Sequence, residues 1–150
     1  MKGGRIPVFG GNGVNGRHDR GNVNQPTVVI GRVGYYCGSI HLTPGEAWVT
    51  DNAFITHFSA ANICINFLIL LLKGTNLKED ENATAQPVIS GSKIYPIIVG
   101  LPPVAEQKRI VAKVDELMAQ CDQLEASLTE GEQIRSRLLE SVLHNALEPA

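Results

Sequence analysis

Residues 104–147 read VAEQKRIVAKVDELMAQCDQLEASLTEGEQIRSRLLESVLHNAL, a stretch without proline and with a single glycine. Apolar residues recur along it at alternating intervals of four and three, the heptad spacing of a helix that packs along another helix. At 1.5 Å per residue, a continuous helix of this length is about 65 Å long. This heptad seam consists of Ile110, Val114, Leu117, Cys121, Leu124, Leu128, Leu138 and Val142.

Gly131 and Arg135 interrupt the seam, which leaves two interpretations of its second half. Leu138 and Val142 resume the repeat in the same phase, and this favours one continuous helix. The alternative is a helical hairpin, because residues 129–132, TEGE, also spell a capping box at which a second helix can begin. A continuous helix of about 65 Å cannot be buried by a domain of about 100 residues, whose radius of gyration is near 13 Å. We therefore expect another helix to cover the seam.

The first hundred residues have a different character. Eleven of the 15 glycines lie in residues 1–45, which is typical of short strands joined by tight turns. We expect strands at residues 6–9, 27–30, 35–40 and 48–58, a long polar loop at 10–26, a buried apolar helix at 60–73, and extended segments at 87–89 and 94–99. The predicted fold class is α+β, with a small mixed or antiparallel β-rich domain and a packed helix at 1–101, followed by a long coiled-coil helix at 102–150.

The distribution of charge, the cysteines and the apolar segments limit the classes of protein to which this chain can belong. The net charge is +4 over residues 1–45, −2 over 46–103 and −4 over 104–150, so the two ends present surfaces for different partners. Three cysteines without a CxxC pair argue against a disulfide framework. The N-terminus shows no secretory apolar segment, and no apolar run is long enough to span a bilayer. We expect a soluble cytoplasmic protein.

Three motif matches are interpreted as structural rather than catalytic. GNGVNG at 11–16 fits the dinucleotide fingerprint, but the polar residues after it cannot open a packing helix, and no acidic residue follows about 20 positions on. Cys37 and His41 lack further converging ligands, so no metal site is expected. Ser39 near His41 lacks a third partner for a triad. From the sequence we therefore expect that the protein binds no cofactor and no metal, and that it is not an enzyme.

The basic residues of the first hundred positions, together with the asparagines among them, are candidates for binding DNA. Arginine reads guanine and asparagine reads adenine in two-pronged geometry, and both residue types alternate here with glycines that let the backbone approach a phosphate. The alternative is a solvated, turn-rich loop, for which Asn, Gly and Asp are also the usual residues. The candidate DNA-binding residues are Arg5, Asn12, Arg17, His18, Arg20, Asn24, Arg32, Tyr36 and Lys93.

The junction at 97–125, IIVGLPPVAEQKRIVAKVDELMAQCDQLE, strongly resembles the specificity (S) subunits of type I restriction–modification enzymes. In that family, a PLPP-x-x-EQ-x-x-I-V segment opens the long helix after each target recognition domain. GRIPVFGGNG at 4–13, IGRVG at 30–34, WVTDNA at 48–53 and QPVISGSKI at 86–94 also resemble the recognition domains. The chain differs in having one recognition domain, which starts late, and one spacer helix, so it resembles a half-subunit or a fragment.

The resemblance implies a non-catalytic subunit that reads double-stranded DNA and docks methyltransferase (M) and restriction (R) subunits. Whole S subunits pack their two long helices antiparallel, so a half-subunit is expected to form a homodimer through the seam. The alternative is a coiled-coil assembly module that binds only protein, with an inactive, truncated recognition domain.

Overall fold

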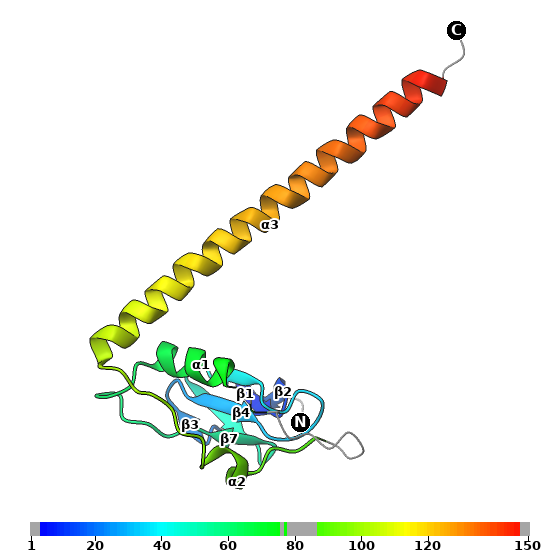
Figure 1. Cartoon of the computed structure of the whole chain (residues 1–150). Helices are drawn as coiled ribbons and strands as arrows, with labels where there is room; N and C mark the ends of the chain where they lie inside the picture. The colour runs from blue at the N-terminus through cyan, green and yellow to red at the C-terminus, as the bar shows by residue number, and fades with distance from the viewer. Residues whose placement is uncertain (1–3, 76, 78–86, 148–150) are drawn as a thin grey trace. The chain divides into compact units, whose positions relative to one another are not determined.

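The computed structural model describes residues 4–75, 77 and 87–147. The chain divides into two compact units, Met1–Lys108 and Arg109–Ala150. Because the division lies inside the long helix α3 (Val104–Leu147), the first turn of this helix belongs to the first unit. Each unit is described below by itself (Figure 1).

Two small sheets form the centre of the first unit. The first is mixed and has the strand order β2-β1-β6-β3, in which β1 and β6 are parallel and the two outer pairs antiparallel. The second is antiparallel, with the order β5-β4-β7. The strands are β1 Ile6–Gly10, β2 Gly13–His18, β3 Val23–Asn24, β4 Val28–Gly31, β5 Ile40–Leu42, β6 Glu46–Val49 and β7 Ala53–Ile55.

The core of the first unit lies between these sheets and is aliphatic, with one aromatic ring. Phe9 packs there with valines and alanines from four other strands, and β4 is buried along its whole length because it is the central strand of its sheet. Burial of such side chains stabilises a fold by roughly 25 cal/mol per Å² of apolar surface. The core cluster is Phe9, Val29, Ala47, Val49 and Ala53, with Val23 and Ile55 packed against it.

Two helices flank the strands, with α1 (Ile65–Gly74) on one side and α2 (Gly91–Ile94) on the other (Figure 1). α1 buries Phe67 and Leu68. A buried amide anchors its N-terminus: Gln107 Oε1 accepts the N–H of Cys64 at 2.8 Å, and Gln107 Nε2 donates to the carbonyls of Asn62 and Pro102 at 2.8 Å each. Gln107 is fully buried, so its three bonds join α1, the preceding loop and the Pro-Pro segment.

α3 is one unbroken helix of 44 residues, so the hairpin interpretation at Gly131 is wrong (Figure 1). Gly131 meets no neighbouring atom that a Cβ would contact, and its helical conformation is therefore decided by its own helix alone. No described side chain from Arg109 onward is buried. The α+β fold with a long C-terminal helix is confirmed, whereas pairing with a second helix stays a prediction.

Three local predictions were wrong. The polar segment at 10–26 contains β2 and β3, because β2 pairs with β1 through its backbone and needs no apolar face to do so. Residues 35–38 form a turn rather than a strand, because Gly34 and Gly38 adopt φ values of +91° and +80°. The segment at 94–99 is not extended into a strand; α2 ends at Ile94, and the preceding segment contributes only a bridge between Val88 and Val33.

Candidate nucleic-acid interface

Seven of the nine candidate DNA-binding residues lie in two separate places, near the two ends of β1. His18 pairs with Ile6 at the start of β1, whereas Gly13 pairs with Gly10 at its end. Four residues of extended chain separate these ends by about 14 Å, at 3.4 Å per residue. The residues predicted as one set therefore form two groups, which we call the Arg17–Arg20 end and the three-turn end.

The Arg17–Arg20 end is defined by Arg5, Arg17, His18 and Arg20, and its side chains are partly engaged with the chain itself. Arg17 Nη1 donates to the carbonyl of Arg5 at 2.9 Å. The N–H of Arg20 donates to His18 Nδ1 at 3.0 Å, and the His18 ring lies 4.7 Å from the Trp48 ring. These contacts hold the turn after β2 and leave the Arg20 side chain exposed.

The three-turn end is formed by residues 11–12, 32–38 and 51–52. The Arg32 N–H donates to the Asn52 carbonyl at 2.8 Å, and Ser39 Oγ donates to the Gly11 carbonyl at 3.2 Å. At Gly11 a side chain would collide with the carbonyl oxygen of Val33, so glycine is required for this close approach. The structure thus brings together three predicted residues, Asn12, Arg32 and Tyr36, all of them exposed.

Two predicted residues belong to neither group. Asn24 is exposed on β3, opposite Glu46 of β6. Lys93 is exposed in α2. The Ile89 N–H donates to the Arg32 carbonyl at 2.8 Å, so the segment before α2 is joined to the three-turn end.

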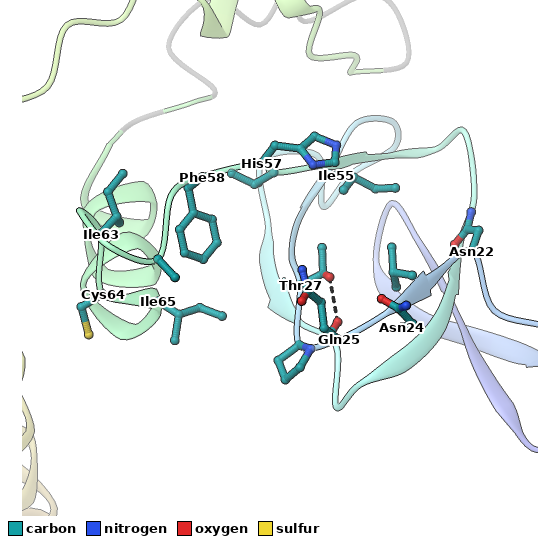
Figure 2. A pocket seen from close by; sticks show the side chains of 14 residues that line it. Asn22, Asn24, Gln25, Thr27, Ile55, His57, Phe58, Ile63, Cys64 and Ile65 are labelled. Atoms are coloured by element: carbon teal, nitrogen blue, oxygen red, sulfur yellow. Dashed lines mark hydrogen bonds between the residues drawn. The ribbon is translucent and has the colours of Figure 1, made fainter.

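A cavity of about 650 Å³ opens elsewhere on the first unit, between the segment at 22–27 and the chain that leads into α1 (Figure 2). Its polar residues are largely occupied: Asn22 exchanges two hydrogen bonds of 2.7 Å with the backbone of Val49, and Thr27 Oγ1 donates to the Gln25 carbonyl at 2.8 Å. Thr56 Oγ1 is buried there without a hydrogen-bond partner among the described residues. Phe58, Ile63 and Ile65 lie on the other side of the cavity, beside α1, whereas Ile55 lies on the same side as Thr27 (Figure 2). No pattern in the sequence predicts this cavity.

His41 lies next to the three-turn end, where the fold changes its ionisation. Burial lowers the pKa of His41, and the nearby positive charge of Lys73 lowers it further. Its Nε2 lies 3.0 Å from Ser39 Oγ, and Gly13 packs against the imidazole ring. The imidazole therefore stays neutral at a lower pH than an exposed one, and it lies beside the three-turn end as a packing group.

The heptad seam is exposed from Leu117 onward, with Leu124 and Leu128 presenting 65% and 71% of their surface. At 100° per residue, the seam from Ile110 to Leu128 forms a stripe about 80° wide, which suits one partner helix. Beyond Gly131 the apolar surface widens, because further large side chains flank it. These flanking residues, which the heptad analysis missed, are Ile134, Leu139, Leu143 and Leu147.

Among residues 4–75, 77 and 87–147, no three His, Cys, Asp or Glu side chains gather as metal ligands. Over the same residues, no helix has the length and apolar character needed to cross a membrane.

A known protein family matches both the β-rich unit and the long helix of this chain. The family model of the type I restriction modification DNA specificity domain matches residues 2–133, which include the β-rich unit and most of α3. The chain belongs to this family. The match includes both ends of the first sheet and most of the seam.

Curated relatives and a solved structure agree with this membership. The chain is 28% identical over 130 residues to the type I restriction enzyme EcoprrI specificity subunit of Escherichia coli, covering 87% of this chain and 31% of the relative. It is 31% identical over 114 residues to the EcoKI specificity subunit of Escherichia coli strain K12, covering 76% of this chain and 22% of the relative. The chain thus spans a third or less of the length of these relatives.

The fold is similar to that of a crystallised type I restriction–modification S subunit from M. genitalium. The TM-score is 0.60 at 18% identity, covering 91% of this chain and 38% of that chain. At this identity the comparison supports the fold alone. It matches the combination of a β-rich unit and a long helix in one chain.

Proposed function

We propose that this specificity-domain chain reads a DNA half-site with its first unit and pairs with a second copy of itself through α3. The observation that carries this proposal is the family match across residues 2–133, which spans the β-rich unit with its two groups of candidate DNA-binding residues and most of the exposed seam. A reading surface and a pairing surface on one chain suit a specificity subunit.

The proposed role is recognition without catalysis. The chain directs methyltransferase and restriction subunits to a DNA site, and these partners supply the chemical steps. The names of the relatives, specificity subunits of type I restriction enzymes, support this division of labour. We further infer a cytoplasmic location, because the proposed substrate is the cell's DNA.

Salt-dependent binding to mixed-sequence duplex DNA tests the reading function. A protein that contacts several phosphates loses orders of magnitude in affinity between 50 and 200 mM salt, because neutralised phosphates release counterions. We expect a steep linear fall of log K with log salt. Binding only to protein, with no measurable duplex binding even at 50 mM salt, would favour the alternative of a coiled-coil assembly module.

The symmetry of the proposed homodimer predicts the form of its target. A closed two-fold dimer presents two identical reading surfaces in inverted orientation, so its preferred site is an interrupted palindrome. Four residues inserted after Leu128 lengthen each helix by about 6 Å, which corresponds to roughly two base pairs of additional gap. Selection of bound sequences from a random pool should show this longer gap. A non-palindromic consensus would indicate that another subunit supplies the second half-site.

The insertion also turns the helix by about 40° beyond one full turn, so some loss of affinity is expected with the longer gap. A seven-residue insertion, two turns less about 20°, keeps the heptad phase and is the matched control. It should lengthen the gap further while retaining more of the affinity. The same gap in all three pools would exclude α3 as the spacer.

A further inference from the structure

We propose that the turn at residues 32–38 enters a groove of duplex DNA, with Tyr35 and Tyr36 contacting sugars and base edges and Arg32 contacting a phosphate. This inference rests on the proposed DNA-reading function and assigns that function to the three-turn end rather than to the Arg17–Arg20 end. The turn is the tip of the hairpin formed by β4 and β5, which are antiparallel neighbours. The major groove admits a two-stranded β-ribbon of this kind.

The backbone of the turn is already ordered in the free protein. The Cys37 N–H donates to the Gly34 carbonyl at 2.9 Å, and the Gly38 N–H donates to the Gly31 carbonyl at 2.7 Å. Cys37 is fully buried beneath the turn and anchors it from the inside. Because binding does not have to order this backbone, little conformational entropy is lost when the turn meets a partner.

The two tyrosines of the turn point away from the core. Tyr35 is 79% and Tyr36 52% exposed, and their rings meet edge to face with centroids 5.1 Å apart. Tyrosine offers a large, rigid surface with few rotamers to lose, and its hydroxyl can bond phosphate or base-edge atoms. Two adjacent tyrosines on an ordered tip therefore form a surface suited to binding.

The neighbouring side chains indicate that the partner is DNA. The Arg32 guanidinium lies 5.5 Å from the centroid of the Phe54 ring and remains exposed. Lys73 and Tyr36 line the same shallow hollow, of about 360 Å³. Asn12 is exposed on the adjacent turn and has the amide that reads adenine. Aromatic, cationic and amide groups are thus exposed at the same end, together with one acidic residue, Asp51, whose carbonyl accepts a hydrogen bond from Arg32 Nη1 at 3.5 Å. The cationic and amide groups suit a negatively charged duplex with polar base edges.

The test separates the aromatic contribution from the ionic one by titrating duplex binding against salt. Tyr35→Ala combined with Tyr36→Ala should weaken binding about tenfold or more at every salt concentration and leave the salt slope unchanged, because no phosphate charge is lost. Arg32→Ala should weaken binding and flatten the slope by about one unit, as expected for one lost phosphate contact.

Two controls test whether a loss of binding is specific to the turn at 32–38 or follows from removing any exposed aromatic side chain. Tyr95→Ala removes a tyrosine that is 83% exposed at the end of α2, and it should bind as the wild type does. Tyr35→Phe combined with Tyr36→Phe keeps the rings and should retain most of the affinity. If the double alanine variant does not fold, a photoreactive phenylalanine at position 36 should still cross-link to duplex DNA, whereas one at position 17 should not.

The outcomes distinguish this inference from the function on which it rests. Full binding by both the double alanine variant and Arg32→Ala, together with reduced binding by Arg17→Ala combined with Arg20→Ala, would move the reading surface to the Arg17–Arg20 end. In that case the chain still reads DNA. Absence of duplex binding by the wild type at low salt would overturn the proposed function itself and this inference with it.

Discussion

The two units of the chain treat their apolar side chains in opposite ways. The first unit buries Phe9, Val29 and Val49 between two sheets within about a hundred residues. The second unit presents Leu117, Leu124 and Leu128 to solvent along a helix without a core of its own. Tertiary packing supplies most helical stability in proteins. The first unit obtains that packing from its own chain, whereas α3 would obtain it from the second copy proposed above.

The width of the exposed apolar surface also differs along α3. Its N-terminal part carries a stripe suited to one helix, whereas Ile134, Leu139 and Leu143 widen the apolar surface beyond Gly131. A wider apolar face calls for more neighbours than a single seam does. In the proposed homodimer, the C-terminal part of α3 would therefore present more apolar surface than one partner helix covers.

The largest effect is expected from placing charge on the seam. Leu117→Asp combined with Leu124→Asp buries four carboxylates in each proposed dimer, and unpaired buried charges are strongly unfavourable. The dimer dissociation constant should rise by at least a hundredfold, so that light scattering shows a monomer at micromolar concentration. The fold of the first unit should be unaffected, because neither residue belongs to it.

The matched control adds the same charge to the opposite face of α3. Ala119→Asp combined with Ala126→Asp lies about half a turn from the seam and should remain dimeric. A seam variant that stayed dimeric would remove α3 from the interface. It would also mean that α3 does not depend on a second copy of the chain, so the two units would not differ in the way proposed.

A smaller effect, confined to the first unit, is expected at Gln107. Gln107→Leu keeps similar volume but removes the bonds to Cys64, Asn62 and Pro102. Unsatisfied buried polar groups are unfavourable, so the free energy of unfolding should fall by about 2–3 kcal/mol. Denaturant unfolding monitored by Trp48, the single tryptophan, measures this change.

Gln133→Leu is the control for Gln107, because it makes the same exchange at an exposed position of α3. It should leave the unfolding midpoint of the first unit unchanged. Equal stability of the Gln107 variant and the wild type would mean that the buried amide joins these segments without stabilising them.

The long helix could be predicted because its pattern is local. A heptad repeat is visible within α3 itself, and its in-phase continuation past Gly131 favoured the unbroken helix that the structure contains. The strand β2 could not be predicted this way, because its exposed residues show no apolar alternation and its pairing with β1 depends on the fold. The aromatic residues of the turn at 35–38 are typical of a strand, but the positive φ values of Gly34 and Gly38 determine its backbone.

The sequence predicted which residue types form the candidate site, but not how those residues are arranged in the fold. Arg17 and Arg32 were predicted to belong to one set of DNA-binding residues. The register of β1 with β2 places Arg17 beside Pro7, whereas the Gly10–Gly13 turn, next to the turn that carries Arg32, lies at the opposite end of β1. Gln107 was missed altogether, because an amide in a polar helix resembles any solvent-facing residue. Its burial depends on Asn62 and Cys64, more than 40 residues earlier in the chain.

The smallest predicted effect is the contribution of His41 to the pH dependence of the first unit's stability. Because burial and then Lys73 lower its pKa in the folded protein, the unfolded chain takes up a proton first as the pH falls. The stability associated with a neutral His41 is therefore present above the unfolded value of about 6.5 and is lost as the pH falls towards the folded pKa. Between pH 7.5 and 5.5, the Trp48-monitored unfolding midpoint should decrease more in the wild type than in His41→Gln. His57→Gln, at an exposed position, should behave as the wild type does, and an equal decrease in all three proteins would assign the pH response to other groups.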